Sequence, residues 1–231
     1  MSTMFNVYQN YAELYDELVN HEDHECNLAI FLRNNIEWKS KSVCEFGVGT
    51  GRVTKLYLND IKSADLFDNS NHMIERAKSN LLEWSTKIQF FETDNREIDT
   101  IEGQYDIVIE GWSFGHLVVE ENDKKEYWID KLVNASFRIS KEKIIFIETM
   151  GTNVEKPEAP GENLRHFYSK LRDYGFKESV IQTNYLFESY EEAARIMGGF
   201  FGEKMQSEIE NKKIKEIKEY TGIWIYDKKK T

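Results

Sequence analysis

Short apolar runs alternate with longer amphipathic stretches along most of this chain. Five runs have the length and composition of buried strands, and they cover residues 42–46, 62–67, 88–92, 106–110 and 143–149. Between the runs, apolar residues recur at helical spacing, as from Ile74 to Trp84 and over residues 122–139. Strands that alternate with helices predict a parallel sheet with right-handed crossovers and helices on both faces.

The chain before the first strand has a helical pattern of its own. Over residues 4–37 the apolar and aromatic positions repeat at helical spacing, among them Tyr8, Tyr11, Leu14 and Tyr15. One interpretation is an amphipathic helix pair packed on the core. A compatible one is a lid over a ligand site, with Tyr11 and Tyr15 facing a substrate.

The chain after residue 150 continues the sheet but contains a long insertion. The pattern predicts a helix over residues 163–174, a sixth strand over 180–187 and a seventh over 222–226. Residues 187–218 are far too many for a hairpin loop, so we expect a helical insertion there. Ser189 is predicted to cap its first helix. Glycines are expected to interrupt the helices and to let Phe200 and Phe201 move as a gate, although these phenylalanines are equally suited to anchoring the insertion.

A glycine-rich turn follows the first strand directly. An acid, Glu45, is followed by three glycines at alternate positions: Gly47, Gly49 and Gly51. Glycine is required where φ is positive or where backbone approaches a ligand closely. A helix that begins at Arg52 would direct free N–H groups at that ligand. The glycine spacing matches neither a dinucleotide fingerprint nor a P-loop.

Polar residues also follow the second, third and fourth strands. Asp68 lies 21 residues after Gly47, the spacing at which an acid accepts both hydroxyl groups of a ribose. After Asp68 come Asn69, the potential helix cap Ser70, and Met73. The third strand ends at Asp94 and Asn95, and the fourth leads into Glu110 and the aromatic loop up to Leu117. In a parallel sheet all these strand ends meet at one edge, where ligands bind.

These four segments, in this order between Val43 and Leu117, resemble the motifs of class I S-adenosylmethionine-dependent methyltransferases. The resemblance implies an α/β fold with a Rossmann-like, seven-stranded, mostly parallel sheet whose seventh strand is antiparallel. It implies a single domain over residues 1–231, with a helical lid (1–37), a donor-binding core (42–150) and a helical cap (187–218). It further implies an enzyme of class EC 2.1.1.- that uses S-adenosylmethionine and releases S-adenosylhomocysteine (SAH). The residues that it assigns to the donor are Glu45, Gly47, Gly49, Gly51, Arg52, Asp68, Asn69, Met73, Asp94, Asn95 and Glu110.

Transfer from a sulfonium donor requires an aligned nucleophile and no metal, so we expect no metal site. A hydroxyl or protonated amine acceptor also needs a base. His116 in the loop after the fourth strand is the first candidate, with packing as its alternative role, and Glu110 is the second. The residues expected to line the acceptor site are Tyr11, Tyr15, Trp112, Phe114, Phe200 and Phe201.

Composition narrows the acceptor class. The net charge of −11 and the interspersed basic residues argue against nucleic acid and anionic membranes as partners. Without a membrane-length apolar run, a signal peptide or a cysteine framework, a soluble cytoplasmic protein is expected, as a monomer or homodimer. The leading hypothesis is methyl transfer to nitrogen or oxygen of a small organic molecule. The alternatives are a nucleotide-binding protein without turnover and an RNA or protein methyltransferase.

Overall fold

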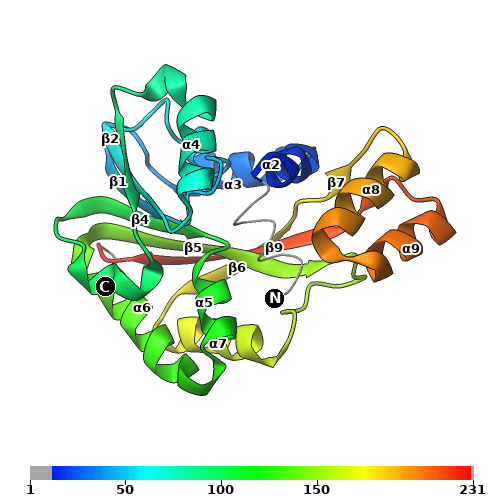
Figure 1. The fold of residues 1–231 in the computed structure, drawn as a ribbon. Helices are drawn as coiled ribbons and strands as arrows, with labels where there is room; N and C mark the ends of the chain where they lie inside the picture. Colours follow the sequence, from blue (N-terminus) through cyan, green and yellow to red (C-terminus); the bar gives the residue numbers. More distant parts are fainter. Residues whose placement is uncertain (1–11, 230–231) are drawn as a thin grey trace.

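Seven strands form one mixed sheet in the computed structural model of this protein, which describes residues 12–229 (Figure 1). The strand order is β3-β2-β1-β4-β5-β9-β6, and only β9 runs antiparallel to its neighbours. This arrangement confirms the predicted Rossmann-like sheet and its antiparallel seventh strand. The strands are β1 (Ser42–Phe46), β2 (Ser63–Asp68), β3 (Ile88–Glu92), β4 (Tyr105–Gly111), β5 (Ser140–Thr152), β6 (Lys177–Gln182) and β9 (Glu219–Asp227).

Helices cover both faces of the sheet (Figure 1). On one face lie α5 (Phe114–Glu120), α6 (Lys125–Ile139) and α7 (Glu162–Asp173), and on the other lie α3 (Asn27–Asn35) and α4 (Asn71–Asn80). Each face has its own apolar cluster. Along β4, Val108 packs in the first cluster while Ile107 and Ile109 pack in the second, because alternate side chains of a strand point to opposite faces.

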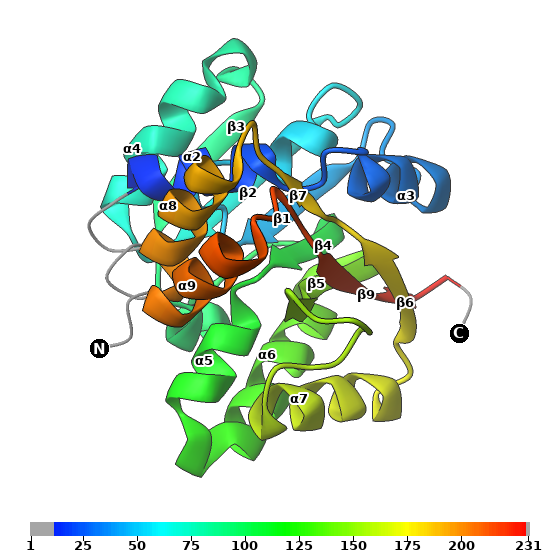
Figure 2. The ribbon, with the colours of Figure 1, turned by 90° about the vertical axis from the view of Figure 1, so that its right-hand side faces the viewer.

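A third apolar cluster joins the start of the described chain to the insertion between β6 and β9. Helix α2 (Ala12–His21) packs against α8 (Tyr190–Phe201), and α9 (Glu203–Lys212) packs along α8 (Figure 2). A two-stranded sheet of β7 (Tyr185–Leu186) and β8 (Glu216–Ile217) closes the base of this insertion. Within the described residues no helix combines the length and apolarity that a membrane crossing requires.

The segment after the glycine turn differs from the prediction. Instead of an α-helix from Arg52, the chain forms turns and a single 3-10 turn, η1 (Thr54–Leu56). The Thr54 hydroxyl donates to Glu45 at 2.9 Å, the Tyr57 hydroxyl donates to the same carboxyl, and Tyr57 and Leu58 are fully buried. These inward contacts bend the segment into the core. No helix N-terminus therefore points at the strand ends here. The other 3-10 helices are η2 (Leu82–Trp84), η3 (Asn95–Thr100) and η4 (Asn122–Lys124).

The insertion also differs in detail. Helix α8 runs without a break through Gly198 and Gly199 and ends only at Gly202. A Cβ at Gly198 would lie 2.7 Å from the Gln206 side chain of α9, and one at Gly199 would lie 3.3 Å from Leu14 of α2. The glycine pair thus allows three helices to pack closely and is not a hinge, which corrects the gate hypothesis. The run predicted as one strand over residues 180–187 is split between β6 and β7.

Candidate functional site

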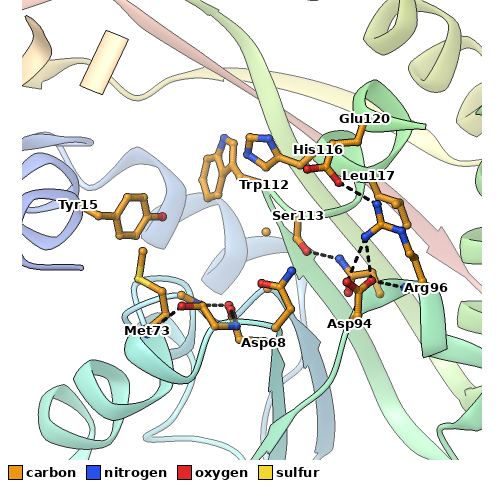
Figure 3. A pocket seen from close by; sticks show the side chains of 16 residues that line it. Tyr15, Asp68, Met73, Asp94, Arg96, Trp112, Ser113, His116, Leu117 and Glu120 are labelled. Carbon is orange, nitrogen blue, oxygen red and sulfur yellow. Dashed lines mark hydrogen bonds and ion pairs between the residues drawn. The ribbon is translucent and has the colours of Figure 1, made fainter. Parts of the chain in front are cut away.

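The carboxyl ends of β1, β2, β3 and β4 meet at a cavity of about 350 Å³, here called the strand-end cavity (Figure 3). Its wall includes residues of the chain segments that follow all four strands and one residue of α2. The lining residues are Tyr15, Gly47, Gly49, Asp68, Asn69, Ser70, Met73, Asp94, Asn95, Arg96, Gly111, Trp112, Ser113, His116, Leu117 and Glu120.

The glycine turn is held by its neighbours rather than left open. Gly47 and Val48 donate their N–H groups to the Phe67 carbonyl at 2.8 and 3.1 Å, and Gly49 donates to the Asp68 carboxylate at 2.8 Å. These three N–H groups therefore already have partners within the protein. Gly47 has φ +70°, and a Cβ there would lie 2.2 Å from the Ser113 Cβ. Glycine is needed at this position because the loop after β4 passes against it.

Asp68 lies on the wall of the cavity with its carboxylate oriented by backbone. Its second contact is with the Ser70 N–H at 2.9 Å, and Ser70 in turn caps α4 through the Met73 N–H, as predicted (Figure 3). Burial raises the pKa of Asp68, while the bonds from these N–H groups act against that rise. A carboxylate has about four acceptor positions, so Asp68 retains capacity to accept from a ligand hydroxyl.

The loop after β3 is tied to the loop after β4. Asp94 accepts from the Arg96 backbone at 2.8 Å and pairs with its guanidinium at 3.1 Å, and Arg96 also pairs with Glu120 of α5 at 3.0 Å (Figure 3). The Asn95 amide donates to the Ser113 hydroxyl at 2.6 Å. Sequence reasoning missed Arg96, Ser113 and Glu120. For Arg96 there was a signal in the sequence, because it lies two residues after the acid that caps η3.

A second cavity of about 310 Å³, here called the side cavity, shares Tyr15, Trp112 and His116 with the first. Helix α8 contributes Phe200 and Phe201 to its wall. Its other lining residues are Leu18, Val19, Glu22, Arg52, Gly115, Val119, Glu148, Thr149, Thr152, Pro160, Leu164, Tyr185 and Glu219. The two cavities therefore meet at an aromatic wall formed by α2 and the segment after β4.

Three residues assigned to the donor lie elsewhere. Glu45 is buried beneath the turn, where burial raises its pKa to about 7, and it lines neither cavity. A Cβ at Gly51 would lie 2.8 Å from Leu81, so this glycine serves helix packing. Arg52 forms a bidentate pair with Glu22 at 2.8 and 2.6 Å and its guanidinium lies 4.1 Å from the Trp112 ring centre, on the wall of the side cavity only.

Three further expectations are corrected or lie outside the described residues. Glu110 is fully buried behind the loop after β4, where its carboxylate accepts from the Ser113 and Phe114 N–H groups at 3.2 Å. Burial, and then the neighbouring Glu148, raise its pKa, and it reaches neither cavity. Phe114 is completely buried against Phe46, so it is a core residue. Tyr11 lies outside the described residues.

His116 stands where the two cavities meet. It is half-buried on α5, and burial lowers its pKa to about 4. The imidazole is therefore neutral at neutral pH and has a nitrogen that can accept a proton. Trp112 beside it has φ +49°, a left-handed conformation that is uncommon for a side chain of this size, and its N–H donates to the Ile147 carbonyl at 2.8 Å.

Residues 43–128 match the protein family described as "Methyltransferase domain". An uncharacterised methyltransferase of Oceanobacillus iheyensis is 29% identical over 124 residues, which cover 52% of this chain and 56% of that protein. One from Bacillus cytotoxicus is 28% identical over 191 residues, covering 80% of this chain and 84% of that protein. Among solved structures, the magnesium protoporphyrin IX methyltransferase of Synechocystis with bound SAH has a TM-score of 0.59 at 13% identity, over 97% of this chain and 96% of that one. This last similarity concerns the fold.

Proposed function

Residues 43–128 form a class I S-adenosylmethionine-dependent methyltransferase domain, and from that premise we propose that the chain methylates a nitrogen or oxygen atom of a small organic acceptor. The observation that carries the proposal is the contact between the two cavities. The strand-end cavity would hold the donor, and the side cavity, about 310 Å³ and largely apolar, would hold the acceptor. Both volumes fall in the range of small-molecule sites.

The residues of the strand-end cavity fit the donor. Asp68 would accept from the ribose hydroxyl groups, and the buried Met73 would lie against the adenine ring. Asn69, Asp94 and Asn95 would border the adenosine. Gly47 and Gly49 would pass beneath the amino-acid part of the donor. Asp94 would need to share its carboxylate with Arg96, which already pairs with it.

The donor supplies its methyl group to an acceptor lone pair, and the electrons of the broken carbon–sulfur bond remain on sulfur. The protein would align the two molecules and exclude water. Tyr15, Trp112 and His116 are placed for this because they border both cavities. We assign His116 the role of proton acceptor, because it lies where the two cavities meet.

A labelled donor separates this proposal from its alternatives. A cell extract is divided by ultrafiltration, and each fraction is incubated with the protein and methyl-labelled S-adenosylmethionine. We expect a labelled product, separated by chromatography from the unreacted donor, in the small-molecule fraction. Label only in RNA or protein would contradict the proposal, and SAH binding without any transfer would indicate a binder without turnover.

A variant of the side cavity gives the matching control. Phe201→Ala should reduce transfer and leave SAH affinity in calorimetry unchanged, because Phe201 lines the side cavity alone. Tyr127→Ala, which changes an exposed aromatic residue of α6, should affect neither. Equal loss of SAH affinity and transfer in Phe201→Ala would show that the two cavities are not separate sites.

A further inference from the structure

Three carboxyl groups line the side cavity, and one of them is already neutralised. Glu22 binds Arg52 through both oxygens, at 2.8 and 2.6 Å. This pair satisfies the one guanidinium on the described wall of the cavity. Glu148 and Glu219 therefore remain as acids with no basic side chain paired to them in the described structure.

Glu219 presents an oxygen with no hydrogen-bond partner. Its side chain is at the start of β9 and only 2% of the residue is exposed. Oε1 accepts from the Thr149 hydroxyl at 3.0 Å and the Thr152 side chain also interacts with this carboxyl group, whereas Oε2 has no hydrogen bond of ordinary geometry among the described residues. A buried polar atom without a hydrogen bond normally costs about 1–3 kcal/mol. The presence of such an atom at Glu219 therefore points to a ligand that supplies the missing hydrogen bond.

Glu148 is held in place on the adjoining strand β5. The residue is 3% exposed, and its Oε1 accepts from the Gly115 N–H of α5 at 2.6 Å. A Cβ at Gly115 would lie 2.8 Å from both carboxyl oxygens, so the helix at this point has room for the carboxyl group only because it carries glycine. The carboxyl group is thus positioned by the fold at the wall that α5 shares with the cavity.

The rest of the wall complements an apolar body. Val19, Leu164, Phe200 and Phe201 belong to it, together with the face of Trp112. Burial raises the pKa of Glu148 and of Glu219 to about 8, because the charged form of each is costly in these surroundings, and a bound cation would favour that charged form. An anionic ligand would add repulsion, and a neutral hydroxyl would supply no charge.

We infer that the acceptor is a small amine with an apolar body, whose cationic nitrogen is held by Glu219 in the side cavity, with the Glu148 carboxyl group on the wall of the same cavity. The inference rests on the proposed function and names its substrate class. An ammonium group has up to three donors, and one of them could bond the open Oε2 of Glu219.

The same carboxyl groups account for the proton in the reaction. A protonated primary or secondary amine must lose one N–H proton before its lone pair can form the new nitrogen–carbon bond. That proton passes to a carboxylate of this pair or to His116. The broken carbon–sulfur bond leaves its electrons on sulfur, so charge and atoms balance without a further reactant.

Binding of three matched probes to the SAH-loaded protein tests the inference. They are 2-phenylethylamine, 2-phenylethanol and 3-phenylpropionate, which share a ring and differ in the charge of the end group. We expect calorimetry at pH 8 to show the amine bound about ten- to hundredfold more tightly than the alcohol, as a charge-assisted bond implies, and the acid not bound. Glu219→Gln should remove this preference and keep SAH affinity, and Glu155→Gln, an exposed residue outside the cavity, should change neither.

Several results would overturn the inference. One is an alcohol or acid that binds as tightly as the amine, another is an unchanged amine affinity in both Glu219→Gln and Glu148→Gln, and a third is that no probe binds. The labelled products of the extract give an independent answer, because a methylated amine stays on a cation exchanger at neutral pH. Labelled small molecules that all pass through it would contradict the amine but support the proposed function. No labelled small molecule at all would contradict the proposed function itself.

Discussion

Replacing Gly47 with alanine tests how the site is assembled. A Cβ at Gly47 would lie 2.2 Å from the Ser113 Cβ and 2.6 Å from its hydroxyl, so Ser113 must retreat by more than about 1 Å to reach ordinary contact. Ser113 is fixed by the Asn95 amide at 2.6 Å and by the bond from its N–H to Glu110 at 3.2 Å. The retreat therefore breaks contacts on the wall of the strand-end cavity.

The expected cost has two parts. A non-glycine residue at φ +70° costs about 1–2 kcal/mol, and overpacking of this kind costs about 1–3 kcal/mol. Gly47→Ala should therefore lower the free energy of unfolding by about 2–5 kcal/mol in urea denaturation. Since the displaced Ser113 and Asn95 both line the cavity, SAH affinity in calorimetry should fall at least about tenfold.

Gly49→Ala is the matched control. Gly49 has φ +52°, but a Cβ there meets nothing closer than Tyr15 at 3.5 Å. In urea denaturation it should show the conformational cost alone, and the difference in stability between the two variants measures the collision with Ser113. Adding Ser113→Gly to Gly47→Ala should recover part of that difference. Two variants of equal stability and equal SAH affinity would refute the reasoning.

Two further predictions concern titratable groups of the site. Asp68→Asn should weaken SAH binding by about ten- to hundredfold in calorimetry, because a charged acceptor for the ribose is lost, whereas Asp60→Asn on the surface should not; equal affinities would contradict the ribose assignment. His116 has a pKa of about 4 in the folded protein against 6.5 as its ordinary value, so between these pH values the unfolded state binds more protons and stability falls as the pH is lowered. For this half-buried group the free energy of unfolding should fall by about 1–3 kcal/mol between pH 7 and 4, and denaturation curves of His116→Asn should not show this decrease. The same pH dependence in His116→Asn and in the unchanged protein would show that His116 does not have this low pKa.

The sheet was predictable from sequence because its strands are short apolar runs that end at turn residues. The bounds predicted for β1 and β3 agree with the structure, and those of the other parallel core strands differ by a few residues at their ends. The absence of the helix expected after the glycine turn could not be predicted. It depends on the hydrogen bonds that Thr54 and Tyr57 make to Glu45 across the turn. The local pattern of apolar and polar residues contains no information on such contacts.

The residues of the candidate site could likewise be predicted only in part. Asp68, Met73 and Asn95 were found because they follow strand ends at recognisable spacing, and strand ends converge in this fold. Glu148 and Glu219 were missed because they lie within β5 and β9, where sequence alone indicates only a strand. Their approach to one cavity follows from the antiparallel pairing of Thr152 with Glu219, which no local pattern reveals.

The position of β9 between β5 and β6 has a consequence for the order of folding. Strand β6 pairs with β9 and with no other described strand, so it joins the sheet only after residues 219–227 have been made. During synthesis at about 5–20 residues per second, β6 then waits roughly two to nine seconds for its partner. Through that interval β5 also lacks one neighbour and presents an open apolar edge, Ile144 to Ile147. The nascent chain is thus most exposed to mispairing and to chaperone binding just before the insertion and β9 are complete.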